Sequence, residues 1–180
     1  MEAYNYRPLD VSRCQLRLLK VDRSLTATSI VQCHLENFDL NNAPRYTALS
    51  YRWSYSEPAD ARPKLEAMEE EQFPLIVDGK LLHVSENLAD FLEVFHGDAR
   101  NKPNWLWIDQ ISINQKNTVE RNQQVGLMSD IYSRCLSLII WLGKASAPAA
   151  QLFWKDSAAR LLQNSYFTRM WIVQEILLAK

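Results

Sequence analysis

The chain is poor in glycine and carries no excess of either charge. Four glycines among 180 residues are too few to supply a glycine-rich phosphate loop at a suitable place. Any phosphate would therefore have to be held by Arg52, Lys144 or a helix N-terminus. With 20 basic and 21 acidic residues the formal net charge is -1, which gives no overall attraction to nucleic acid or to an anionic membrane. We expect no nucleic-acid partner.

Signals for export and for membrane insertion are also missing. No apolar run approaches the roughly 18 residues that a membrane-spanning helix needs. The first residues lack the basic and then apolar pattern of a signal peptide. The sequence therefore predicts a cytoplasmic protein without a transmembrane segment. Its 180 residues fit one domain, in which we expect N-terminal strands in residues 1–45 and a core in residues 46–180.

Cysteine and histidine are scarce. Cys14, Cys33 and Cys135 are widely spaced in apolar surroundings, which predicts reduced thiols in the core. The three histidines are too dispersed to complete a zinc site. Cys33 and His34 are adjacent, but the alternation of a strand would point their side chains to opposite faces. We expect neither a metal ion nor a resident cofactor.

The first half of the chain reads as strands. Residues 14–21 and 29–35 alternate apolar and polar positions and are β-branched, so they could form a hairpin. Residues 46–51 read as a buried strand after the turn signal at 41–44. Residues 74–77 and 80–84 flank Asp78-Gly79, a pair that tolerates the positive φ angles of a two-residue hairpin turn.

Helices and strands alternate in the second half. Ser85 is a plausible cap for a helix that buries Leu88, Phe91, Leu92 and Phe95 and ends at Gly97. After a strand at 105–108, a further helix begins near 117 and ends near 135. Residues 136–142 are apolar apart from Ser137, as expected of a strand buried on both faces. Two more helices are predicted near 148–163 and 166–179. This order predicts an α/β protein with a mainly parallel sheet flanked by helices.

The helix near 117–135 carries two detailed predictions. Asn117 and Glu120 are three residues apart and resemble a capping box. The apolar spacing then predicts that one face of the helix buries Val125, Met128, Tyr132 and Cys135.

Polar side chains follow three predicted strands, where open α/β sheets place their ligands. They are residues 50–53, then Asp109-Gln110 with Asn114-Gln115, then Gly143-Lys144. A simpler reading is that Asp109 and Asn114 only fix a loop by hydrogen bonds from the side chain to the backbone. Position alone favours this simpler reading.

Trp171 and Glu175 form a fourth candidate. On a helix these residues are four apart and share a face, so a carboxylate would lie beside a large aromatic surface. Such a setting desolvates the acid and raises its pKa toward a range useful in acid–base chemistry. The structural alternative is a partly buried glutamate paired with Arg169 or another cation.

Together these blocks resemble the heterokaryon-incompatibility (HET) domain of fungi. They occur in order at residues 48–53 (Ala-Leu-Ser-Tyr-Arg-Trp), 106–109 (Leu-Trp-Ile-Asp), 113–115, 120–132, 141–143 and 169–175. The resemblance implies a cytosolic effector of non-self recognition that triggers programmed cell death. It also implies self-association and an upstream receptor or incompatibility partner.

The same blocks are similar, more remotely, to Toll/interleukin-receptor (TIR) domains, which have a flavodoxin-like fold. Trp171 followed by Glu175 is similar to the TIR pattern in which the glutamate is catalytic in NAD-cleaving enzymes. The resemblance implies Glu175 as the catalytic residue and NAD as the substrate. It implies a pocket lined by the residues Ser50, Tyr51, Arg52, Trp53, Asp109, Asn114 and Trp171.

Two functions stay open on the sequence. One is an effector that hydrolyses NAD and depends on Glu175. The other is a non-enzymatic module that self-associates and recruits a partner that executes cell death.

Overall fold

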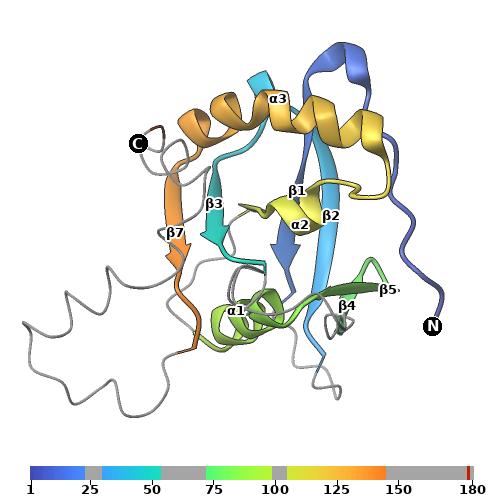
Figure 1. Ribbon diagram of the computed structural model, residues 1–180, viewed down its shortest axis with the longest axis vertical. Coiled ribbons are helices and arrows are strands. Elements are labelled where there is room, and N and C mark those ends of the chain that lie inside the picture. Colours follow the sequence, from blue (N-terminus) through green and yellow to red (C-terminus); the bar gives the residue numbers. More distant parts are fainter. Residues whose placement is uncertain (23–29, 54–71, 99–104, 145–177, 179–180) are drawn as a thin grey trace, which may run out of the picture.

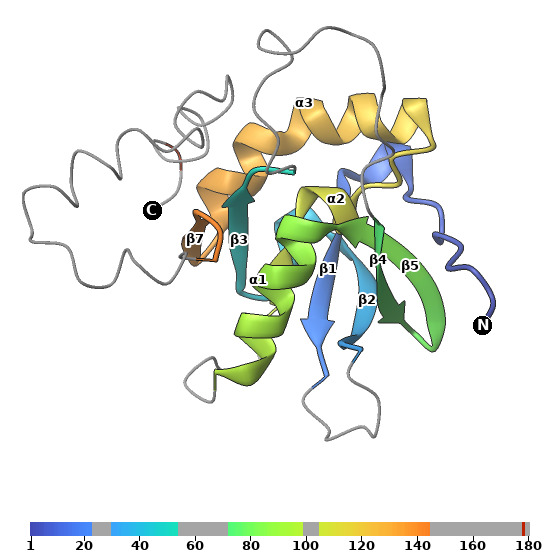
Figure 2. The same ribbon diagram turned by 60° about the horizontal axis from the view of Figure 1, so that its bottom comes forward.

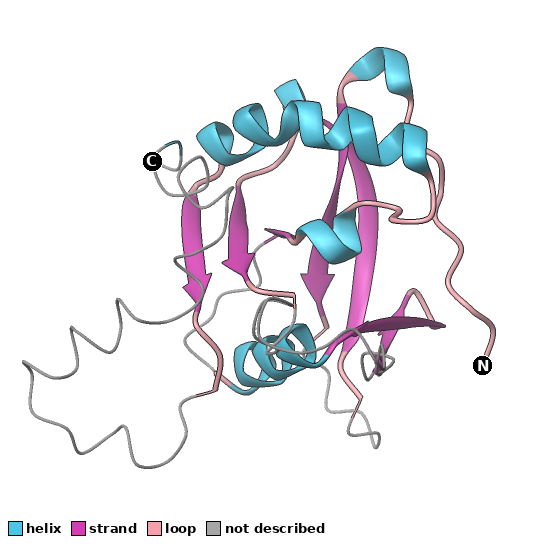
Figure 3. Cartoon of the chain, in the orientation of Figure 1, coloured by secondary structure: helices cyan, strands magenta, loops and turns pink. Residues whose placement is uncertain are grey.

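The computed structural model describes residues 1–22, 30–53, 72–98, 105–144 and 178. Within them, seven strands form one sheet with the spatial order β5-β4-β2-β1-β6-β3-β7. The strands are β1 (Gln15–Val21), β2 (Gln32–Asp39), β3 (Tyr46–Tyr51), β4 (Gln72–Val77), β5 (Lys80–Ser85), β6 (Trp105–Trp107) and β7 (Ser137–Trp141). The helices are α1 (Glu86–Gly97), α2 (Asp109–Ser112) and α3 (Thr118–Arg134), with short 3-10 turns at Val11–Arg13 and Leu40–Asn42. The helices flank the strands (Figure 3), which confirms the α/β class.

The sheet is mixed. β3 pairs in parallel with β6 and β7, and β2 pairs in parallel with β4. The pairs β1–β2, β1–β6 and β4–β5 are antiparallel. The N-terminal hairpin is thus confirmed, whereas the parallel arrangement is confined to part of the sheet. Figure 2 shows the arrows of β1 and β3 pointing in opposite directions. The short strand β6 pairs with both of them.

The two faces of the sheet carry separate apolar cores. One contains Leu19, Leu49 and Tyr51 with Leu88 and Phe91 of α1, and the other contains Leu18, Ala48 and Trp107 with Ile131 and Tyr132 of α3. All six residues of β3 are buried because successive side chains of this inner strand enter the two cores in turn. The strands therefore lie between α1 and α3 (Figure 1).

The neighbours β6 and β7 of strand β3 both follow it in sequence. The segment that contains β4, β5 and α1 leads from β3 to β6, and the segment that contains α2 and α3 leads from β6 to β7 on the other side of β3. Because α1 and α3 pack on opposite faces of the sheet, these two segments use opposite faces. Open α/β sheets bind ligands in the crevice outside the carboxyl ends of their strands.

Local turn signals predicted two elements well. Asp78 and Gly79 adopt φ angles of 50° and 76° and join β4 to β5. Helix α1 follows Ser85, ends at Gly97 and buries the four predicted apolar residues. The Ser85 hydroxyl does not cap this helix, because it donates to Gln110 Oε1 at 3.0 Å.

The buried face of α3 agrees with the prediction in part, because Tyr132 and Cys135 are buried and Met128 is half-buried. Asn117 caps the helix, and its side chain accepts from the amides of Val119 and Glu120. The carboxylate of Glu120 does not complete a capping box, because it binds Arg17. Val125 is exposed, and the fully buried neighbour is Gln124, whose Nε2 donates to the carbonyl oxygen of Gln15. The helix therefore meets β1 through polar groups, which the apolar spacing did not predict.

β7 also differs from the prediction. It lies at the end of the described sheet, and its five residues are half-buried or exposed, so it is not buried on both faces. The helices predicted at 148–163 and 166–179 fall outside the described residues apart from Leu178. No helix in the described part of the chain is both long and apolar enough to cross a membrane.

Candidate functional site

The carboxyl ends of β3, β6 and β7 meet at one edge of the sheet. Residues 52–53 follow β3, residues 108–110 follow β6 and residues 142–144 follow β7. Because these three strands are parallel neighbours, the residues that follow them share that edge. The predicted residues Arg52, Trp53 and Asp109 therefore lie in one region.

Asp109 and Trp53 contact each other directly. The indole Nε1 of Trp53 donates to Asp109 Oδ2 at 2.9 Å, and the backbone amide of Gln110 donates to Asp109 Oδ1 at 2.7 Å. Gln115 Nε2 donates to the carbonyl oxygen of Asp109 at 3.0 Å. Both carboxylate oxygens of Asp109 are thus hydrogen-bonded, and the side chain joins the ends of β3 and β6.

Ser50 and Tyr51 are more deeply placed. Both belong to β3 and are 1% exposed, so they lie in the cores beneath this edge. The Tyr51 hydroxyl is 3.5 Å from Gln110 Oε1, which also accepts from the backbone amide and the hydroxyl of Ser85. Gln110 therefore ties the start of α1 to the end of β6, a role that the sequence did not indicate.

Asn87 is a second residue that the sequence analysis missed. It is 2% exposed; its Nδ2 donates to the carbonyl oxygen of Arg52 at 2.6 Å, and its Oδ1 accepts from Trp141 Nε1 at 2.7 Å. It thereby links α1 to the ends of β3 and β7. One signal was present, because Asn87 shares a helical stripe with Phe91 and Phe95, where an amide needs a partner.

Asn114 belongs to a different network. Its backbone amide donates to Glu120 Oε1 at 2.7 Å, and its Oδ1 accepts from the amide of Lys116 at 3.2 Å. These contacts match the simpler reading, in which the side chain fixes the turn before α3. The contribution of Asn114 to a ligand site stays a prediction.

The Glu120 carboxylate holds the buried guanidinium of Arg17 in a bidentate ion pair. Arg17 also donates to the carbonyl oxygens of Ser112 at 3.1 Å and Arg7 at 2.6 Å. The pair therefore connects β1, the N-terminal segment and the segment between α2 and α3.

Lys144 does not offer an isolated charge to a phosphate. Its Nζ lies 2.6 Å from Asp90 Oδ1 and 2.8 Å from Glu93 Oε2, both on α1. Hydrogen bonds to Asp90 and Glu93 raise the pKa of Lys144 above its ordinary value. Of the proposed phosphate ligands, Arg52 is the one that lies beside Trp53.

The predicted catalytic pair lies outside the described residues. Trp171 and Glu175 both fall in residues 145–177. The described part of the site therefore contains the contact between Trp53 and Asp109 and its supports, and the role of Glu175 stays a prediction.

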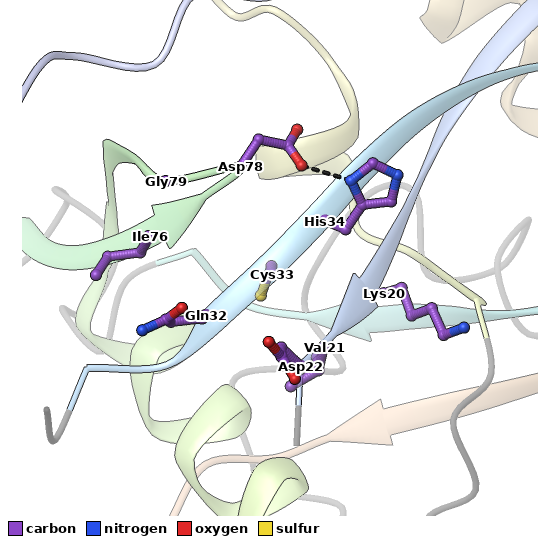
Figure 4. Close-up of a pocket in the computed structure, with 9 residues that line it drawn as sticks. All are labelled: Lys20, Val21, Asp22, Gln32, Cys33, His34, Ile76, Asp78 and Gly79. Carbon is purple, nitrogen blue, oxygen red and sulfur yellow. Dashed lines mark hydrogen bonds and ion pairs between the residues drawn. The ribbon is translucent and has the colours of Figure 1, made fainter. Parts of the chain in front are cut away.

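A separate cavity of about 550 Å³ lies at the end of β1, away from these residues. Figure 4 shows Cys33 in this cavity and His34 bonded to Asp78 at its rim. Burial, with the negative charges of Asp22 and Asp78, raises the pKa of the Cys33 thiol, so the thiol stays protonated at neutral pH. The cavity thus lacks an activated cysteine nucleophile among its described residues.

The cysteine predictions hold in part. All three cysteines are free; Cys33 and Cys135 are buried, but Cys14 is exposed and so is not a core thiol. Cys33 belongs to the α1 core, whereas His34 lies 6.2 Å from the Trp105 ring on the other face, as strand alternation predicted. In the described ranges, no group of three or more histidine, cysteine, aspartate or glutamate side chains is arranged to hold a metal ion.

Comparisons with known proteins give two matches and one negative result. Residues 46–159 match the family described as heterokaryon incompatibility protein (HET). The chain is 30% identical over 143 residues to heterokaryon incompatibility protein 6, OR allele, of Neurospora crassa. That alignment covers 79% of this chain and 21% of the relative, so the chain spans about a fifth of the length of this curated relative. No solved structure matches.

Proposed function

Because the chain belongs to the heterokaryon incompatibility (HET) family, we propose that it is a cytoplasmic cell-death effector domain of fungal non-self recognition that hydrolyses NAD. The similarity to heterokaryon incompatibility protein 6 of Neurospora crassa supports the biological role. We further infer a TIR-like, flavodoxin-like core. The spatial order β6-β3-β7 supports it, because β3, the first of these three parallel strands in sequence, lies between the other two.

The observation that carries the proposal is the position of Trp53 and Asp109 at one edge of the sheet. They follow the carboxyl ends of β3 and β6, and open α/β sheets bind their ligands outside the carboxyl ends of their strands. Asn87, Gln110 and Ser85 fix the surrounding backbone. A site on such a support can orient a substrate with little loss of conformational entropy.

The proposed reaction breaks the bond between the nicotinamide nitrogen and the ribose. The electron pair of that bond leaves with nicotinamide, and positive charge builds on the ribose. A carboxylate at Glu175 would stabilise this oxocarbenium-like transition state. Water then adds to the ribose carbon and releases a proton, which gives ADP-ribose and nicotinamide. No metal or redox step is required.

The test is an NAD-consumption assay on the purified full chain, with and without enforced clustering. We expect the wild-type chain to consume NAD and Glu175→Ala to lose at least a hundredfold in rate, since one carboxylate that stabilises charge contributes about two to three orders of magnitude. Glu36→Ala is the matched control, because Glu36 is an exposed carboxylate on β2. Unchanged NAD in the wild type while expression still kills cells would reject the enzyme.

A second function is favoured by β7. In the described part of the sheet this strand pairs on one side only, and Leu136 and Ile140 are 51% and 41% exposed. Such edges promote association. As a non-enzymatic module, the domain would self-associate through this edge and recruit a partner that executes death on a signal from an upstream receptor. Toxicity would then survive Glu175→Gln and disappear in Ile140→Lys.

A further inference from the structure

Trp53 is unusual among the aromatic residues of this fold. Among the tryptophan, tyrosine and phenylalanine side chains that the structure describes, it is the most exposed, at 39%. Trp107 is fully buried, and Trp105 and Trp141 are partly buried against the cores. An indole with 39% of its surface exposed gains less from the hydrophobic effect than a buried one, so its place at the ligand-binding edge of the sheet calls for a further explanation.

The ring is also held in a fixed direction. Its Nε1 donates to Asp109 Oδ2, and the other oxygen of the same carboxylate is held by the amide of Gln110. The carbonyl oxygen of the preceding residue, Arg52, is held by buried Asn87. The indole therefore loses conformational freedom before a ligand arrives, which lowers the entropy cost of stacking on it.

The carboxylate of Asp109 determines which type of ligand the indole of Trp53 can bind. A hydrogen bond from the indole N–H to a carboxylate polarises the ring and increases the negative character of its face. The carboxylate itself adds a negative charge beside the ring. Cations bind to the faces of tryptophan rings more strongly than to those of other aromatic residues. The site is therefore suited to a ring that is both planar and positively charged.

We propose that Trp53, oriented by Asp109, is a stacking platform for a cationic planar heteroaromatic ring. Given the proposed function, on which this choice rests, the ring is the oxidised nicotinamide of NAD. Its pyridinium nitrogen carries the positive charge that cleavage of the glycosidic bond discharges. Reduced nicotinamide is neutral and is no longer aromatic, so the platform distinguishes the oxidised from the reduced dinucleotide.

The probes are 1-methylnicotinamide, which is the cation, and nicotinamide, which is the neutral ring. Their affinities for the full chain are measured by ligand-detected NMR titration. We expect the cation to bind more tightly than the neutral ring to the wild type. Trp53→Ala should weaken cation binding by roughly 3- to 30-fold, the range that exposed to desolvated cation–π pairs correspond to. Trp53→Phe should give an intermediate loss.

Two variants test the mechanism of selection. Asp109→Asn removes the charge and one of the two acceptor oxygens, so it should reduce the preference for the cation over nicotinamide. Trp105→Phe is the control, because that indole packs edge-on against Phe38 on the α3 face, and it should leave both affinities unchanged. Equal binding of the two probes, absence of binding, or no effect of Trp53→Ala would overturn the platform.

The outcome is separable from that of the NAD assay. Consumption of NAD that persists with unchanged KM in Trp53→Ala would leave the proposed enzyme intact and reject the platform. Selective binding of 1-methylnicotinamide that depends on Trp53, with no consumption of NAD, would support the platform and reject hydrolysis.

Discussion

Among the residues that the structure describes, the buried charged residues are Glu120 and Arg17. Glu120 is 5% exposed and Arg17 is 1% exposed, so both charges have lost their water. The carboxylate accepts from Arg17 and from the amide of Asn114, and Arg17 reaches two backbone carbonyls. These bonds offset the desolvation of the pair only while both partners are present.

Glu120→Gln should therefore destabilise the fold strongly. The substitution preserves the size of the side chain but leaves the Arg17 guanidinium buried without a counter-charge. We expect a loss of about 3–5 kcal/mol in the free energy of unfolding, the usual cost of breaking a buried ion pair. Urea unfolding monitored by circular dichroism measures it, and Arg17→Met should act in the same direction.

The control for this effect is the surface ion pair between Arg13 and Asp39. The two side chains are 60% and 23% exposed. Exposed ion pairs contribute about 0–1 kcal/mol, so Arg13→Ala should shift the urea midpoint only slightly. If Arg13→Ala lowered the free energy of unfolding as much as Glu120→Gln does, burial would not explain why the ion pair of Glu120 matters more for stability.

At the level of the elements, glycine acts in opposite ways in a turn and in a helix. Gly79 completes the turn between β4 and β5 at φ 76°, and Gly126 lies in the exposed middle of α3. A Cβ atom at either position would meet nothing within 4 Å, so steric crowding does not distinguish them. Backbone conformation alone should decide the effect of an added methyl group.

The same substitution should thus have opposite signs at these two positions. Gly79→Ala forces alanine into the left-handed region and should cost about 1 kcal/mol. Gly126→Ala restricts the unfolded chain and favours the helix, so it should stabilise the protein by about 0.5–1 kcal/mol. Urea midpoints of the two variants provide the comparison. Shifts in one direction for both would show that the turn conformation is not the cause.

Helix α3 shows why part of the fold could not be predicted. Asn117 was recognisable as a cap because the signal is local. The polar part of the buried face was not recognisable, since Glu120 and Gln124 are polar and their partners, Arg17 and Gln15, lie 103 and 109 positions away in the sequence. Spacing predicts burial from apolar residues, and it cannot detect a polar face that is satisfied by a distant strand.

The candidate site shows the same limit. Polar residues after the strands predicted where Arg52, Trp53 and Asp109 would meet. Asn87 and Gln110 support that site from α1 and α2, and their function depends on contacts with Trp141 and Ser85 that only the folded sheet creates. A sequence pattern can thus predict where a strand ends, but it cannot predict which distant residues hold the residues of a site in place.

For the whole molecule, we predict a loss of stability at high pH, because ionisable thiol and hydroxyl groups are buried in the fold. Burial raises the pKa of the Cys33 thiol and the pKa values of the Tyr6 and Tyr46 hydroxyls above their ordinary values. A group with a raised pKa contributes its full stability below its unfolded pKa and loses it as pH rises toward the folded pKa. The loss of stability therefore begins near pH 8.5 for the thiol and near pH 10 for the tyrosines, which are their pKa values in the unfolded chain.

The free energy of unfolding should therefore fall as pH rises above about 8.5. Cys33→Ala should flatten this fall between about pH 8.5 and 10, where thiols titrate before tyrosines. The measurement is a series of urea titrations across this range for both proteins. An identical slope in the wild type and in Cys33→Ala would show that this thiol does not contribute.

β1 is the middle strand of the described sheet, although it is the first in sequence and precedes the family match, which starts at residue 46. It pairs with β2 on one side and with β6 on the other; β2 in turn pairs with β4, and β4 pairs with β5. A gene fragment that starts at residue 46 would encode β3, β6 and β7 and the hairpin of β4 and β5. It would omit β1 and β2, the two strands that lie between these groups in the sheet. We therefore expect expression of this domain to require residues 1–45 as well as the matched motifs.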